Sequence, residues 1–190
     1  MRRHHGLAAA AVAVAVLGAP PAAEARFPTF APKTIVPGQS IGGVAVAATR
    51  AAALTRWGRP DTCFTYRGLE TCQWKTRVTL NGFPTDVYYA TIYLRSGRVV
   101  GVQVMRSQKP SFDVKLLQLK TDKNVGIGSS MATVRARYRI RLTGRGEASE
   151  SRAQIRTKGR CTMFYAPDRP WTVVRSVSVA RCGEAGTSLR

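Results

Sequence analysis

Four cysteines constrain the fold of this chain more than any other feature. They fall into two groups, Cys63 with Cys72 and Cys161 with Cys182. An even number of cysteines in an exported chain predicts two disulfides, for which three pairings are possible. We predict Cys63–Cys72 and Cys161–Cys182, because each pair brackets one candidate hairpin. A zinc site is disfavoured, since the chain has no Cys-x-x-Cys spacing and no histidine after residue 25. We expect neither a metal nor a cofactor.

Export itself is predicted by residues 1–25, which have the layout of a secretory signal peptide. A basic start precedes an apolar stretch over 7–18, and Ala23 and Ala25 supply the small residues before a cleavage point. The apolar stretch is about a dozen residues long, whereas a membrane span needs roughly 18 or more. A retained anchor is therefore the less favoured interpretation. Cleavage after Ala25 predicts a mature protein that is secreted, extracellular or held in the cell envelope.

The predicted signal peptide contains the two histidines of the chain, His4 and His5. Its removal therefore restricts the catalytic mechanisms open to the mature protein. Histidine is the usual general base, so Ser-His-Asp and Cys-His nucleophiles are excluded from the mature chain. Two pairs of carboxylates could still hydrolyse a glycoside, namely Glu70 with Asp86 and Glu147 with Glu150. We interpret these acids as solvated turn residues, which makes a histidine-free carboxylate hydrolase the weakest of three functional hypotheses.

The net charge is strongly positive, at +20 for the full chain. Cleavage removes Arg2, Arg3 and Glu24, two positive charges and one negative, and leaves +19 on residues 26–190. The basic residues are spread along the chain, which indicates the surface of a folded body rather than a basic tail. Such a surface attracts acidic partners and polyanions, although it is also compatible with a merely solvated basic exterior.

The pattern of apolar residues predicts an α+β fold of two tandem units, each a short helix packed on an antiparallel sheet. Helices are expected at 50–57 and 131–138, preceded by Thr49 and Ser130 as N-caps, with a strand from 139 onward. Other strands are expected at 63–66, 72–74, 86–94, 99–105, 153–157, 161–165 and 172–181. The predicted parts are a signal peptide at 1–25, a Pro-rich lead-in at 26–37, a first α+β unit at 38–107, a second at 116–182 and a flexible tail at 183–190.

An internal repeat underlies this division. At an offset of 81 residues, the segment that leads into each helix and the helix itself match. At an offset of 75, Val102–Arg106 matches Val177–Arg181. Chance similarity in a chain rich in Ala, Val and Arg is the competing explanation. The matched pairs at offset 81 are Val44 with Val125, Val46 with Ile127, Thr49 with Ser130, Ala53 with Val134, Arg56 with Arg137 and Trp57 with Tyr138.

A tandem of this kind, exported and with one disulfide in each unit, resembles the beta-lactamase inhibitory protein family. Val44–Thr49 and Val125–Ser130 resemble that family's short stretch before its helix, and so do the segments that follow, Leu54–Pro60 and Val134–Tyr138. The resemblance covers about Thr34–Cys182 and implies a concave sheet surface that grips another protein. The family's inhibitory loop carries an acidic residue that enters the target's active site, and this chain has no matching residue. Asp86, Glu147 and Glu150 are the acids in candidate loops or strand starts, and none is a counterpart, which argues against inhibition of beta-lactamase itself.

The leading hypothesis is a secreted, non-catalytic protein-binding module, with inhibition of an extracellular enzyme as one form of it. The partner would be an extracellular or envelope protein, with an acidic surface as one option. The alternative is an electrostatic binder of anionic envelope polymers or of a membrane surface. Export argues against nucleic acid as the physiological partner, although basic and aromatic residues interleave in the way that single strands require. The candidate surface residues are Tyr88, Tyr89, Tyr93, Arg135, Arg137, Arg139, Trp171 and Arg175, with Tyr89 and Tyr93 on one strand face and Tyr88 on the other.

Overall fold

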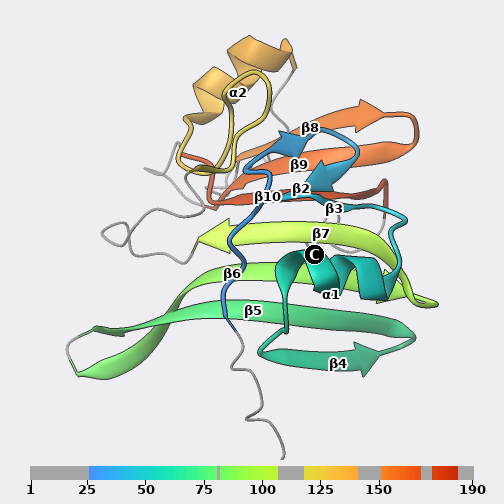
Figure 1. Cartoon of the computed structure of the whole chain (residues 1–190). Helices are drawn as coiled ribbons and strands as arrows, with labels where there is room; N and C mark the ends of the chain where they lie inside the picture. Colours follow the sequence, from blue (N-terminus) through green and yellow to red (C-terminus); the bar gives the residue numbers. More distant parts are fainter. Residues whose placement is uncertain (1–25, 81, 107–117, 141–150, 168–172, 184–190) are drawn as a thin grey trace, which may run out of the picture.

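The computed structural model describes residues 26–80, 82–106, 118–140, 151–167 and 173–183 (Figure 1). The predicted signal peptide at 1–25 and the tail beyond Gly183 lie outside these residues. Within them the protein is α+β, as the sequence predicts, with two short helices and a large antiparallel sheet.

The large sheet has seven strands in the order β4-β5-β6-β7-β10-β9-β8, and every neighbouring pair is antiparallel. Apart from the strand expected from 139 onward, the seven predicted strands are present in this sheet, although most are longer than the sequence suggested and β10 is shorter. The bounds are β4 Thr62–Tyr66, β5 Leu69–Leu80, β6 Phe83–Arg95, β7 Arg98–Arg106, β8 Ser151–Thr157, β9 Arg160–Ala166 and β10 Ser176–Arg181. The β5–β6 hairpin extends past its neighbours, and Figure 1 shows it projecting from the sheet.

A small three-stranded sheet precedes the first helix and was not predicted. Its strands are β1 (Ile35–Val36), β2 (Ser40–Ile41) and β3 (Val44–Ala45). Gly38, Gly42 and Gly43 lie in the turns of this region, and the residues between the turns pair as strands. Gly42 adopts φ 54°, and the ring of Phe30 packs so closely against it that a side chain there would collide. The lead-in therefore supplies both β1 and a buried phenylalanine to the core.

The two helices, α1 (Arg50–Trp57) and α2 (Met131–Tyr138), begin at the predicted N-caps. Thr49 Oγ1 accepts a hydrogen bond from the Ala52 N–H at 3.2 Å, and Ser130 Oγ accepts one from the Thr133 N–H at 3.0 Å. These bonds satisfy donors that the first helical turn leaves open.

The expected strand directly after α2 is wrong for its described part. Arg139 takes a left-handed conformation with φ 52° and ends the helix, and Ile140 is not in a strand. The alternating pattern through 134–140 misled the prediction, because Met131 and Val134 already bury one helical face at i, i+3 spacing. Residues 141 and 142 of the expected strand lie outside the described residues.

Both helices and the small sheet cover one side of the large sheet, which we call the first face. An aromatic row holds this side together: the ring centroids of Phe30 and Trp57 lie 5.3 Å apart and those of Trp57 and Trp74 lie 5.4 Å apart, both edge-to-face. Tyr138 of α2 packs similarly close to Phe164 of β9, at 5.9 Å. One continuous hydrophobic core therefore runs beneath α1 and α2. Figure 1 shows α1 lying across β6 and β7 on this side.

Matching backbone contacts fix the segment before each helix to the sheet. Ala47–Ala48 exchanges two hydrogen bonds with Val99, at 2.7 and 2.9 Å. Gly128–Ser129 exchanges two with Val174, both at 2.8 Å. The two segments are 81 residues apart and the two valines are 75 residues apart, which are the offsets of the sequence repeat. The halves meet where β7 pairs with β10, and there Gln103 stands directly opposite Ser178.

Candidate functional site

The candidate site is the side of the large sheet opposite the helices, which we call the second face. Successive strand residues alternate between faces, and residues directly opposite on neighbouring strands point to the same side. Within the part of the chain that the structure describes, the helices, the small sheet and the buried residues of 26–34 and 118–130 all belong to the core on the first face. The second-face residues, from β4 to β8, are Thr62, Phe64, Tyr66, Leu69, Thr71, Gln73, Lys75, Arg77, Asp86, Tyr89, Thr91, Tyr93, Gly101, Gln103, Met105, Ser176, Ser178, Ala180, Cys161, Met163, Tyr165, Arg152, Gln154 and Arg156.

A hydrogen-bonded chain of side chains crosses the middle of this face. The Tyr93 hydroxyl donates to Gln103 Oε1 at 2.7 Å, and Gln103 Nε2 donates to Ser176 Oγ at 3.0 Å. The chain joins β6, β7 and β10 and so spans both halves of the molecule. Burial raises the pKa of Tyr93 above its ordinary value of 10.0, so its hydroxyl stays a donor at neutral pH. Because the partners satisfy one another, the side chains are held in one arrangement.

A bulge on β6 arranges the tyrosines. The register shifts between Thr76 and Arg77, and Val87 is left without a direct partner on β5. Val87 and Tyr88 are both buried on the first face, whereas Asp86 and Tyr89 face the other side. Two residues of a bulged strand oppose one on its partner, which changes the alternation locally.

Asp86 is the acidic residue of this region, and two cations hold it. Arg77 Nε lies 2.9 Å from Asp86 Oδ1 and Lys75 Nζ lies 3.7 Å from Oδ2. The Lys75 ammonium also lies 6.0 Å from the ring centroid of Tyr89. Burial, and then the charge of Asp86, raises the pKa of Tyr89, while Arg77 opposes that shift. Tyr89 is therefore surrounded by two positive charges and one negative charge.

A second contact between a tyrosine and a cation lies on β8 and β9, at the other end of the second face. The Arg152 guanidinium lies 5.7 Å from the ring centroid of Tyr165. Gln154 Nε2 lies 2.9 Å from Cys161 Sγ, and Arg156 is exposed beside them. Tyrosines paired with cations therefore occur at both ends, with the polar Tyr93–Gln103–Ser176 chain between them.

The structure does not bring the predicted surface residues together. Tyr88 is 3% exposed and contributes to the core beside Phe27, so its inclusion was wrong. Arg175 is also 3% exposed and was wrong as a surface residue. Tyr89 and Tyr93 lie on the second face, and Trp171 lies outside the described residues. The remaining three, Arg135, Arg137 and Arg139, are exposed on or just after α2, on the first-face side.

Sequence reasoning missed Gln103, Arg152 and Tyr165 as members of the face. Alternation within β9 places Tyr165 on the same side as Cys161, so that much could be found in the sequence. Their proximity to Tyr93 could not be found, because it depends on β7 pairing with β10.

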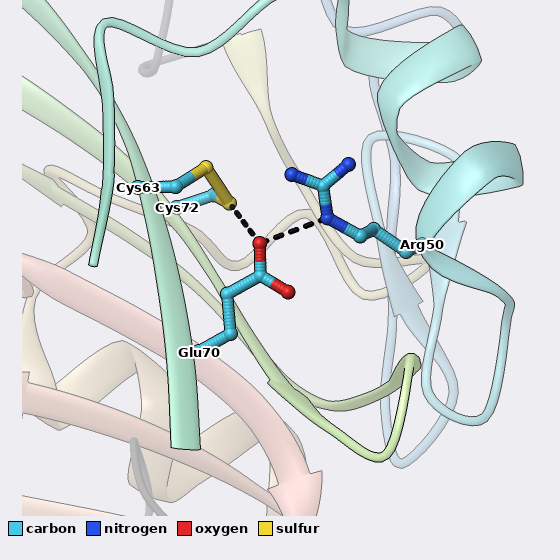
Figure 2. The surroundings of a disulfide bond; sticks show 4 residues. All are labelled: Arg50, Cys63, Glu70 and Cys72. Carbon is cyan, nitrogen blue, oxygen red and sulfur yellow. Dashed lines mark hydrogen bonds and ion pairs between the residues drawn. A yellow bond between two sulfur atoms is a disulfide. The ribbon is translucent and has the colours of Figure 1, made fainter. Parts of the chain in front are cut away.

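Both predicted disulfides are confirmed: Cys63–Cys72 links β4 to β5, and Cys161–Cys182 ties β9 to the residue after β10. Figure 2 shows Glu70 beside the first bond, with its Oε1 2.8 Å from Arg50 Nε and 3.5 Å from Cys72 Sγ. Cys63, Cys72 and Glu70 cluster as closely as the ligands of a metal ion do. The two sulfurs are bonded to each other, however, so no thiolate is available to a metal.

The candidate carboxylate pair Glu70 and Asp86 does not converge. Glu70 belongs to the first face with Arg50, and Asp86 lies on the second face with Arg77 and Lys75. Glu70 stands opposite Leu94. Leu94 is eight positions along β6 from Asp86, which is about 25 Å along a strand. Glu147 and Glu150 lie outside the described residues. Among the described helices, none has the length and apolarity to cross a membrane.

Comparison with known proteins gave matches of structure only. No protein-family model matches the chain, and no curated protein matches it. A cysteine-rich secretory protein from Staphylococcus aureus superposes with a TM-score of 0.50 at 12% identity, covering 77% of this chain and 47% of that one. An extracellular protein containing a SCP domain from Bacillus anthracis superposes with a TM-score of 0.47 at 12% identity. This match covers 72% of this chain and 44% of that one. The chain thus spans less than half of each, and the first match supports a shared fold alone.

Proposed function

We propose that the protein is a non-catalytic protein-binding module that takes an acidic partner protein on the second face of its sheet. The observation that carries the proposal is the composition of that face. Tyr89 lies beside Lys75 and Tyr165 beside Arg152, with the Tyr93–Gln103–Ser176 chain between them, on a side that no described helix covers. Tyrosine and arginine are the side chains most enriched at the energetic centres of protein interfaces.

The fixed arrangement of this face supports the same conclusion. Tyr93, Gln103 and Ser176 are joined by hydrogen bonds of 2.7 and 3.0 Å, and Tyr165 and Tyr89 each rest against a cation. Side chains that are already ordered lose less conformational entropy on binding. A non-catalytic role is supported by the carboxylates, because Glu70 and Asp86 lie on opposite faces and each is held by an ion pair.

The proposal includes export and a duplicated architecture. Export is supported by the pattern of residues 1–25 and by the two disulfides, and the structural neighbour from Staphylococcus aureus is described as secretory. Two tandem units are supported by the matching contacts of Ala47–Ala48 with Val99 and of Gly128–Ser129 with Val174. A sheet built from two such units is also what the resemblance to the beta-lactamase inhibitory protein family implies. Inhibition of an extracellular enzyme is the more specific form of the proposal.

A charge-matched comparison tests the proposal. The mature protein is immobilised, exposed to secreted and envelope material, and washed with salt up to about 1 M, where the Debye length falls to about 3 Å. One variant, Arg152→Gln with Arg156→Gln, removes two charges from the second face. The control, Arg135→Gln with Arg137→Gln, removes two from α2. We expect a retained protein at high salt with the wild type and the control, and its loss with the second-face variant. Equal retention by both variants would contradict the proposal.

The second candidate is an electrostatic binder of anionic envelope polymers or of a membrane surface. The observation that favours it is the group of exposed arginines on and just after α2, Arg135, Arg137 and Arg139, in a chain of net charge +20. Binding of this kind is sensitive to salt and to total charge. Elution of polyanions by salt, equal losses with both charge variants and no retained protein would favour this candidate over the first.

A further inference from the structure

Strand β4 is an open edge of the large sheet. It stands at the end of the strand order, and in the described residues no strand pairs with its outer side. All five residues of Thr62–Tyr66 are exposed. Phe64 and Tyr66 are 51% and 66% exposed, which places two of the three large exposed hydrophobic residues of the described chain on this one short strand. An edge of this kind presents unpaired backbone groups to which another strand can add.

The outward backbone groups can be identified from the register. Directly opposite residues of an antiparallel pair alternate between hydrogen-bonded pairs, with Cα atoms about 5.5 Å apart, and non-hydrogen-bonded pairs at about 4.5 Å. Cys63 and Cys72 stand directly opposite with Cα atoms 4.1 Å apart, so they form a non-hydrogen-bonded pair. The N–H and C=O of Cys63 therefore point away from β5, and by alternation those of Thr65 do so too.

The two edges of the sheet differ in protection. Natural edges are commonly blocked by charged side chains, prolines or bulges. The opposite edge, β8, carries Arg152 and Arg156 among its seven residues. Strand β4 contains no charged residue and no proline, and its register with β5 is continuous from Thr62 to Tyr66. This contrast indicates that β4 is kept open.

Strand β4 is also held in place before any partner arrives. The disulfide Cys63–Cys72 fastens it to β5 at its second residue. On the adjacent strand, Glu70 stands opposite Thr65 and is bound by Arg50 of α1 at 2.8 Å (Figure 2). An edge whose position is fixed loses less entropy when a strand adds to it.

Charge selects the occupant. Arg67 directly follows β4, Arg59 lies three residues before it, and both are exposed. Asp61 is the acid between them, and its Oδ2 already accepts the Lys75 N–H at 2.6 Å. A second copy of the mature chain would bring another charge of +19 to the same place. We propose that the β4 edge binds an extended segment of a partner protein by strand addition, with acidic residues at the ends of that segment and apolar or β-branched residues between them.

The test uses the capped peptide EVTVTVE and its basic counterpart KVTVTVK. Thr65→Pro removes the outward N–H without removing a bond to β5, whereas Thr65→Val keeps the N–H. Wild type and Thr65→Val should bind EVTVTVE in an NMR titration, and Thr65→Pro should bind at least about tenfold more weakly. Peptide should slow hydrogen exchange at Cys63 and Thr65, and KVTVTVK should not bind. Unchanged Trp fluorescence would show that Thr65→Pro is folded.

Three results would overturn the proposal: equal binding by Thr65→Pro, equal binding of the two peptides, or no binding by the wild type. A wild-type dimer in sedimentation that Thr65→Pro abolishes would overturn it in favour of a second copy. The inference shares with the proposed function only the expectation of a protein partner. The variant Arg152→Gln with Arg156→Gln separates the two, because it should lose the partner of the second face and still bind the peptide.

Discussion

The two disulfides should contribute unequally to stability, in an order that the structure determines. Cys63–Cys72 closes a loop with a sequence separation of 9, and Cys161–Cys182 one of 21. The loop-entropy relation then gives about 2.6 kcal/mol for the first bond and about 3.3 kcal/mol for the second. Replacing both cysteines of a pair by alanine should therefore cost more free energy of unfolding at the second bond than at the first.

Burial is similar at the two bonds and leaves this ordering unchanged. One cysteine of each bond is fully buried, Cys72 in the first and Cys161 in the second, while Cys63 is exposed and Cys182 is half-buried. Removing either bond therefore removes packing at one buried sulfur, and the difference in loop length decides the order. Urea unfolding followed by the fluorescence of Trp57 and Trp74, both buried in the core, measures the free energy. A larger loss from the Cys63–Cys72 variant, or a loss below about 1 kcal/mol from either one, would refute the reasoning.

Three further predictions concern the caps, the core and the second face. Thr49→Ala and Ser130→Ala should each lower the free energy of unfolding by about 1 kcal/mol in urea, because each removes a helix N-cap bond; losses near zero at both would contradict the caps. Phe30→Ala should cost about 3–5 kcal/mol, because the ring is buried against Trp57, and an unchanged urea midpoint would exclude that packing. The raised pKa of Tyr93 implies stability that is intact below pH 10 and falls as the pH rises through the folded pKa; Tyr93→Phe should flatten this fall, and an identical alkaline profile would contradict it.

Local features of the fold could be predicted because each depends on neighbouring residues. Thr49 and Ser130 were recognisable as N-caps, and each helix begins directly after its cap. The disulfides could be paired because each links residues that are close in sequence. Alternation is also a local property of a strand. It predicted that Tyr89 and Tyr93 of β6 point to one face of the sheet and Tyr88 to the other.

The features that could not be predicted depend on long-range pairing. The small sheet consists of two-residue strands, too short for a hydrophobic period, and Ile35 is recognised as a strand residue only through its pairing with Ile41. The bulge at Val87 arises from the register with β5 rather than from the residues of β6 alone. Arg175 was predicted as a surface cation because its burial depends on the way the segment before β10 lies against β9, with the Arg175 N–H bonded to the Tyr165 carbonyl at 2.8 Å.

The pairing of β7 with β10 connects the proposed duplication to the proposed binding face. Gln103 and Ser178 are counterparts at the offset of 75, and they stand directly opposite each other. When a residue stands directly opposite its own counterpart on an antiparallel strand, a local two-fold axis passes between the two residues. The offset of 75 in the sequence and the register of β7 with β10 therefore agree with one local two-fold axis. Across that axis Tyr93, opposite Gly101, corresponds to Tyr165, opposite Ser176. The two tyrosines therefore lie on either side of the axis on the second face, and a partner that contacted both would bridge the two halves of the sheet. Such a partner would be lost if either unit were removed, because neither half alone forms the face.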